Sequence, residues 1–154
     1  MASYLPDFVH YLRDNFGGLP HIRFLLDIER LTLGAGQAIP LALIVNEAVT
    51  NSIKYAFPGN CQGEIAIGLH TTDRQVQLYV SDNGIGIDDA IEKAELNSPG
   101  IQLMKGLTRE IYGTLSFETN KGVRIGVAFD QNMLDDPEVA DSSPQQFMPE
   151  KRSC

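Results

Sequence analysis

The sequence predicts an α/β fold of the two-layer sandwich type, with a mixed, mostly antiparallel sheet of about five strands covered on one face by about three helices. Residues 41–58 repeat apolar side chains at helical spacing, and two other stretches, 3–16 and 100–112, show the same period. Between them, shorter stretches alternate apolar with polar residues, as half-buried strands do. The two patterns interleave along 154 residues, which is the length of one domain.

The composition excludes several classes of protein. Apolar residues make up 43% of the chain and charged residues 21%, which is unlike a fibrous or disordered chain. The 20 acidic residues outnumber the 12 basic ones, and a net charge of −8 would repel a nucleic-acid partner. Cys61 and Cys154 have neither disulfide-framework nor metal-binding spacing, and no apolar run approaches roughly 18 residues. We therefore expect a cytoplasmic protein in which this chain makes no direct membrane contact.

The first expected element is a helix over residues 3–16, which Gly17-Gly18 closes. Its apolar side is formed by Leu5, Phe8, Leu12 and Phe16. We assign residues 1–18 to a docking or linker helix. A strand is predicted over residues 22–28, where apolar residues alternate with mostly polar ones. Residues 31–38, which include Gly34 and Gly36, are expected to form a flexible connection.

The organising element is the helix predicted over residues 41–58, with Pro40 suited to its first turn and Pro58-Gly59 to its stop. At about 100° per residue, Glu47, Asn51 and Lys54 fall within roughly 60° of arc, opposite an apolar face. An acid, an amide and an amine in one row suit a divalent cation and the phosphates that it bridges. The same row is compatible with a solvated helix face.

Two alternating stretches, 64–70 and 75–81, predict a hairpin whose second strand runs into Asp82. Gly84 and Gly86 follow this carboxylate closely. A carboxylate at a strand end before two glycines indicates a site, a turn or both. We expect the hairpin to deliver Asp82 to the edge of the sheet.

Residues 88–98 are polar and acidic, which is typical both of a surface loop and of a mobile lid. The lid is the favoured interpretation, because Gly86 and Gly100 flank the stretch. Gly100 opens a predicted helix that ends at Gly113. Since a helix N-terminus attracts anions, free amides from Gly100 to Gln102 are expected to meet phosphate oxygens.

The last two predicted strands cover residues 114–119 and 123–129 and are joined by the turn at 120–122. Beyond Asp130 the sequence loses all periodicity and is rich in acidic residues. We therefore assign residues 131–154 to an acidic, disordered tail.

Three motifs in this order resemble one family. NEAVTNSIKYAF is followed some 25 residues later by DNGIGI, and then by PGIQLMKGL. They resemble the N, G1 and G2 boxes of the Bergerat-type ATP-binding fold shared by gyrase, MutL, heat-shock chaperones and histidine kinases. The YAFPG ending, the short lid and the single glycine of the third motif are most similar to the catalytic domains of bacterial sensor histidine kinases. The resemblance covers residues 22–129, and we assign 19–130 to an ATP-binding catalytic domain.

The resemblance implies ATP and Mg²⁺ as cofactors and gives roles to the matching residues. Asn51 would bind the metal, and Glu47 would act through the metal's water shell or activate the phospho-acceptor. Lys54 would neutralise phosphate charge, which makes Glu47 and Lys54 the implied catalytic residues. Asp82 would accept the exocyclic amine of adenine. The other positions that the resemblance places at the nucleotide are Tyr55, Gly84, Gly86, Gly100 and Ile101.

The function implied by the resemblance is that of a sensor histidine kinase. This domain would transfer the ATP γ-phosphate to a histidine on a separate dimerisation domain of the same kinase, for relay to a response regulator. His10 does not match the acceptor motif of the family, so the fragment is expected not to phosphorylate itself. One departure stands in the last strand, where many members carry a threonine that helps to bind adenine and this chain has Val123.

Two alternatives remain open. The first motif also resembles the serine kinases that act as anti-sigma factors, although these usually have a richer glycine pattern in the third motif. The altered last strand also leaves room for a non-catalytic nucleotide-binding or interaction module.

Overall fold

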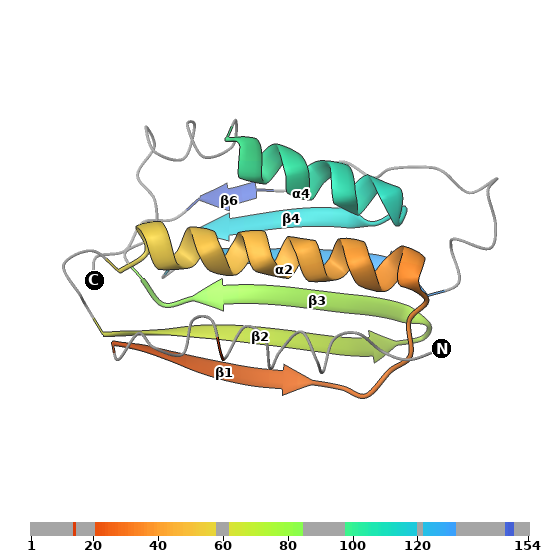
Figure 1. The fold of residues 1–154 in the computed structure, drawn as a ribbon, viewed down its shortest axis with the longest axis horizontal. Helices are drawn as coiled ribbons and strands as arrows, with labels where there is room; N and C mark the ends of the chain where they lie inside the picture. The colour runs from red at the N-terminus through yellow and green to blue at the C-terminus, as the bar shows by residue number, and fades with distance from the viewer. Residues whose placement is uncertain are drawn as a thin grey trace.

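The computed structural model of the protein describes residues 14, 21–57, 62–84, 98–119, 122–131 and 147–149. The predicted helix over 3–16 lies outside these residues, apart from Asp14 in a helical conformation. The elements, all but β5 labelled in Figure 1, are β1 (Ile22–Ile28), α2 (Ala35–Tyr55), β2 (Gly63–Thr72), β3 (Gln75–Asp82), α4 (Pro99–Glu110), β4 (Thr114–Thr119), β5 (Arg124–Asp130) and β6 (Phe147–Pro149).

One mixed sheet has the strand order β1-β2-β3-β5-β4-β6. The pairings β2–β3, β3–β5 and β4–β5 are antiparallel, whereas β1–β2 and β4–β6 are parallel. The α/β class and the mostly antiparallel sheet of five main strands are confirmed. The parallel β1–β2 pair is possible because α2 crosses between the two strands.

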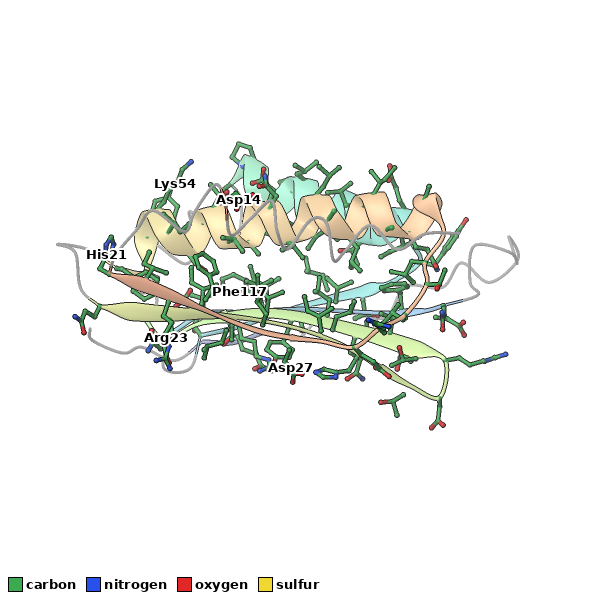
Figure 2. The ribbon with its side chains drawn as sticks, turned by 60° about the horizontal axis from the view of Figure 1, so that its bottom comes forward. Asp14, His21, Arg23, Asp27, Lys54 and Phe117 are labelled. Carbon is green, nitrogen blue, oxygen red and sulfur yellow. The ribbon has the colours of Figure 1, made fainter. Side chains whose placement is uncertain are left out.

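The core lies between the sheet and the helices α2 and α4, which cover one face of the sheet (Figure 2). Alternate residues of β3 face this layer, namely Val76, Leu78 and Val80. They meet the apolar side of α2, where Leu41 and Ile44 are fully buried. Each such aliphatic side chain contributes about 1.5 to 3 kcal/mol relative to an exposed one. The opposite face of the sheet is the more solvated one, as its charged residues Arg23 and Asp27 show in Figure 2.

The helix α2 begins at Ala35, so the prediction of a flexible connection through Gly36 and a first turn at Pro40 was wrong. Pro40 lies inside the helix, where the missing N–H removes one hydrogen bond. Burial explains the extra turn, because Ala38 is fully buried and the Gln37 side chain donates to the Asp130 main-chain oxygen at 3.1 Å. Among the described residues, neither helix combines the length and apolarity that a membrane-spanning helix needs.

The segment predicted as a disordered tail contributes the strand β6. Its main chain pairs with β4 in the register Phe117 with Phe147 and Thr119 with Pro149. Such pairing relies on main-chain groups, which leave no hydrophobic period in the sequence. The expectation of disorder is therefore wrong for residues 147–149, and the remainder of the tail after Gln131 lies outside the described residues.

Candidate active site

Asp82 is the last residue of β3, which is a central strand. The carboxylate therefore lies at the end of the sheet, not on an edge strand, and it is only 6% exposed. Its Oδ1 atom accepts hydrogen bonds from the main-chain N–H groups of Gly84 at 3.0 Å and Val123 at 3.2 Å. Its Oδ2 atom accepts one from the Ser52 hydroxyl at 2.8 Å. Donors from α2, from the loop after β3 and from the start of β5 thus hold one carboxylate.

This carboxylate has capacity for one more donor. Burial raises the pKa of the Asp82 carboxyl, while the hydrogen bonds from Gly84, Ser52 and Val123 act in the opposite direction. An ionised carboxylate offers about four lone-pair sites. Within the described part of the chain, Oδ1 accepts two hydrogen bonds and Oδ2 accepts one. The free position on Oδ2 suits an amine or N–H of a ligand and would repel a carbonyl oxygen.

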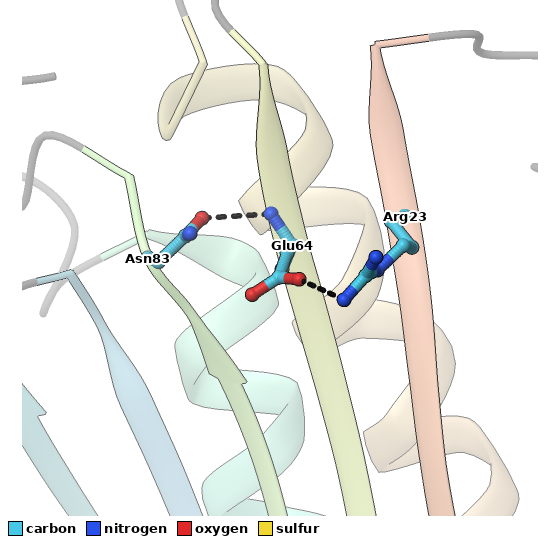
Figure 3. A network of polar contacts seen from close by, with 3 residues as sticks. All are labelled: Arg23, Glu64 and Asn83. Carbon is cyan, nitrogen blue, oxygen red and sulfur yellow. Dashed lines mark hydrogen bonds and ion pairs between the residues drawn. The ribbon is translucent and has the colours of Figure 1, made fainter.

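The residue after Asp82 ties this strand end to β2. The Asn83 side-chain oxygen accepts from the Glu64 N–H at 2.7 Å, and the Asn83 N–H donates to the Glu64 main-chain oxygen at 3.2 Å. The Glu64 carboxylate in turn pairs with Arg23 of β1 at 2.8 Å, as Figure 3 shows. Two hydrogen bonds to the Glu64 main chain therefore tie the loop that carries Asp82 to β2, whereas the solvent-exposed Arg23–Glu64 pair links β1 to β2.

Two glycines allow close packing of the main chain around Asp82. A side chain at Gly84 would overlap the main chain of Ala56 at the C-terminus of α2. Gly122 has a φ of +114°, and a side chain there would overlap the Asp82 main chain. Both positions therefore need glycine for close packing. Gly86, the other glycine of the motif, lies outside the described residues.

Glu47 and Asn51 come from successive turns of α2 and meet the first turn of α4. A Cβ atom added to Gly100 would lie 3.0 Å from the Glu47 Oε2 atom and 3.6 Å from the Asn51 Nδ2 atom. The Asn51 Nδ2 atom is buried and has no hydrogen-bond partner among the described residues. An unpaired buried donor costs about 1 to 3 kcal/mol, so this amide is suited to a ligand that supplies the missing acceptor.

The N-terminus of α4 differs from the expected row of free amides. Ser98 caps the helix, because its side chain accepts from the Ile101 N–H at 3.3 Å and its main-chain oxygen accepts from Gln102 at 3.0 Å. Pro99 has no N–H to donate. Of the three amides expected to bind phosphate, only that of Gly100 has no acceptor within the described residues.

The structure separates the other predicted site residues. Lys54 and Tyr55 are exposed in the last turn of α2, and Figure 2 shows Lys54 projecting away from the sheet. The Ile101 side chain is buried in the core, so only its main chain faces the helix N-terminus. The structure thus brings Glu47, Asn51 and Gly100 together, whereas Lys54 is exposed to solvent.

Sequence reasoning missed two groups that hold Asp82. One is Ser52, a buried hydroxyl on the side of α2 that was treated as core. A polar residue on the buried face of a helix was the available signal, since such a group needs a partner. The other is the Val123 N–H, a main-chain donor that no side-chain pattern reveals.

These residues fit a nucleotide with a divalent cation. The Glu47 carboxylate and the Asn51 amide are the oxygen-bearing groups that Mg²⁺ prefers, and the glycine of α4 leaves space beside them. The described residues contain no cluster of three or more His, Cys, Asp or Glu that could hold a metal alone. Mg²⁺ does not need such a cluster, because it usually keeps several waters and shares its shell with substrate phosphates.

Comparisons with known proteins give relatives of two kinds. The chain is 41% identical to the serine-protein kinase RsbW of Listeria innocua over 56 residues, or 36% of each protein. It is 28% identical to the sensor histidine kinase PdtaS of Mycobacterium tuberculosis over 85 residues, which are 54% of this chain and 17% of that protein. The chain therefore spans about a third of the length of the first relative and less of the second.

The fold comparison and the family model agree. The histidine kinase domain of the blue-light-activated histidine kinase EL346 of Erythrobacter litoralis superposes with a TM-score of 0.75 at 17% identity, covering 84% of this chain and 60% of that one. This likeness shows the fold. The model of the histidine kinase-like ATPase domain matches residues 21–125, which contain α2, Asp82 and the first turn of α4. The chain therefore belongs to the histidine kinase-like ATPase domain family.

Proposed function

We propose that this chain is the ATP-binding catalytic domain of a sensor histidine kinase. It would transfer the ATP γ-phosphate to a histidine on a separate dimerisation domain of the same kinase, for relay to a response regulator. The observation that carries the proposal is the closeness of Gly100 to Glu47 and Asn51, where a Cβ atom would meet both side chains, while Ser52, the next residue of α2, holds Asp82. One turn of α2 thereby joins an acceptor suited to an adenine amine to groups suited to phosphates.

The roles of the residues follow from their chemistry. Asp82 accepts the amine of adenine at the free position on Oδ2. Asn51 would hold Mg²⁺ through its side-chain oxygen, and its amide, unpaired among the described residues, would donate to a phosphate oxygen. Glu47 orders the water around the metal or accepts the proton of the attacking histidine. Lys54, exposed in the last turn of α2, neutralises phosphate charge. Mg²⁺, when bound, neutralises phosphate charge, which is the main requirement of phosphoryl transfer.

The described histidines are unsuited to accept the phosphate. His70 pairs with Asp27 at 3.1 Å on the sheet face opposite the helices, and so on the far side of the sheet from Glu47. His21 directly precedes β1, the edge strand that is separated by β2 from the strand carrying Asp82. His10 lies outside the described residues. The acceptor is therefore sought on another domain.

The test is transfer of radioactive phosphate. The chain is incubated with γ-labelled ATP and Mg²⁺, alone and together with a supplied histidine-bearing dimerisation domain. We expect acid-labile label on the supplied domain and none on the chain alone, and Asn51→Ala should abolish the transfer. Acid-labile label on the isolated chain would contradict this assignment and would point to His10.

A serine kinase that acts as an anti-sigma factor is the second candidate, and the identity with RsbW favours it. Phosphoserine survives acid, whereas phosphohistidine does not. Acid-stable label on a protein substrate, together with capture of a sigma factor, would support this candidate against the first. Binding of ATP with no transfer to either kind of substrate would instead support a non-catalytic nucleotide-binding module.

A further inference from the structure

A stack of three residues lies on the open face of the sheet, opposite the helices. Gly68 and Tyr79 are direct neighbours across β2 and β3. A side chain at Gly68 would overlap the Tyr79 ring, so the ring occupies the space over this glycine. The Arg124 guanidinium carbon lies 4.2 Å from the centre of the same ring. Arg124 at the start of β5 is thus anchored to the middle of the sheet by a cation–π contact.

Arg124 directly follows the residues that support Asp82. The Val123 N–H donates to the Asp82 Oδ1 atom at 3.2 Å, and the Asp82 N–H donates to the Val123 main-chain oxygen at 2.9 Å. Gly122 is pressed against Asp82 with a φ of +114°. The pair of Ser81 with Arg124 is the last in the ladder between β3 and β5. Val123 therefore stands between a glycine with wide conformational freedom and a residue fixed by the stack.

We propose that Tyr79 and Arg124 are positioning residues for the nucleotide base, acting from the face of the sheet opposite to the site. The stack holds the start of β5, and so keeps the Val123 N–H on Oδ1 of Asp82. The two donors on Oδ1 keep the carboxylate in one orientation, so that the free position on Oδ2 stays directed toward the ligand. The inference rests on the proposed function, because it takes Asp82 as the acceptor of the base.

The first measurement is calorimetric titration of the full chain with metal-free ADP. We expect Arg124→Ala and Tyr79→Leu each to weaken ADP binding about two- to fivefold, the range that an exposed cation–π contact supplies. Tyr79→Phe keeps the ring and should bind ADP as the wild type does. Arg23→Ala is the matched control, because it removes the same charge from the same sheet face while its ion pair with Glu64 is solvent-exposed.

The second measurement is hydrogen exchange of the Val123 amide without nucleotide. Exchange should become faster in Tyr79→Leu and Arg124→Ala, and should stay unchanged in Tyr79→Phe and Arg23→Ala. Equal weakening of ADP binding in Arg23→Ala and Arg124→Ala would overturn the inference, because it would reveal a general charge effect. Unchanged ADP affinity and unchanged Val123 exchange in both stack variants would overturn it as well.

The failure of the proposed function has a different signature. If the wild type does not bind ADP, or if Asp82→Asn leaves ADP affinity unchanged, the assignment of the base site is wrong. The exchange of Val123 still reports whether the stack holds the start of β5. If exchange is faster in the stack variants but ADP does not bind, the stack does hold the start of β5. Its role in recognising the base is then wrong.

Discussion

Replacing Asp82 with asparagine separates the ligand-binding role of this carboxylate from its structural role. An asparagine at this position can keep its oxygen on the N–H groups of Gly84 and Val123. Its amide nitrogen would take the place of Oδ2, and the Ser52 hydroxyl can rotate to accept from it. The internal hydrogen bonds are therefore retained in number, while the buried charge disappears.

The effect on nucleotide binding follows from the position left free on Oδ2. In Asp82→Asn a donor faces the amine of adenine, so a hydrogen bond to an ionised acceptor is lost. Such a bond contributes about 1.5 to 3 kcal/mol, which corresponds to a weakening of roughly 10- to 150-fold. ATP and ADP should weaken equally, with and without Mg²⁺, because neither the phosphates nor the metal contact this residue in the proposed site.

The effect on stability has the opposite sign. Burial raises the pKa of Asp82 above its unfolded value, so the native state binds this proton more tightly than the unfolded state does. The stability that the group contributes is fully present below the unfolded pKa, and is lost as pH rises through the native pKa. At pH 7 the ionised carboxylate therefore costs stability, and Asp82→Asn should melt at the same temperature or higher. This difference should shrink as the pH is lowered.

Calorimetric titration and thermal melts between pH 4 and pH 8, chosen to span about the ordinary carboxyl range and neutrality, would test both effects. The wild type should lose ADP affinity as pH falls through the raised pKa of Asp82, because a protonated carboxyl is a poorer acceptor. The reasoning is refuted if Asp82→Asn melts several degrees lower and binds ADP normally. That result would make the carboxylate a structural link between α2, β3 and β5.

Three further predictions concern other parts of the chain. Asn51→Ala should weaken Mg·ATP more than metal-free ATP, because the metal ligand is lost together with the hydrogen bond to a phosphate oxygen, and it should not lower the melting temperature, because the amide nitrogen has no partner among the described residues; titration with and without EDTA checks this. Gly100→Ala should raise helix stability by about 0.5 to 1 kcal/mol but weaken ATP more than ADP, since the added methyl would lie beside Glu47. Arg74→Gly should raise the free energy of unfolding in urea by about 1 kcal/mol, because Arg74 has a φ of +69°.

The sequence predicted the parts of the site that depend on local periodicity. Glu47 and Asn51 share a helix face because residues four apart do so in any helix, and Asp82 lies at a strand end because the alternation stops there. The contact of Gly100 with Glu47 could not be predicted from residues alone, because it depends on how α4 packs against α2. The Val123 N–H was equally hidden, since every residue except proline carries such a donor.

The errors have a common physical origin in tertiary contacts. Pro40 suggests a helix start by its local preference, but the burial of Gln37 and Ala38 extends the helix past it. The strand β6 pairs with the main chain of β4, and its own three residues contain no pattern that predicts a strand. In both cases a neighbour distant in the sequence decides the structure, and such a neighbour is absent from a local pattern.

The two ends of the candidate site, at Asp82 and at Asn51, differ in how many internal contacts hold them. At Asp82, the described residues supply three donors, and Gly122 packs against its main chain, so this end is formed before a ligand arrives. At Asn51, a buried donor is unpaired and Lys54 is exposed, so the described residues leave this end without partners when no ligand is bound. A preformed end binds at small cost in ordering, whereas an incomplete end gains most from the group that completes it. The base should therefore dominate the affinity for ADP, and the phosphates with their metal should decide whether transfer occurs.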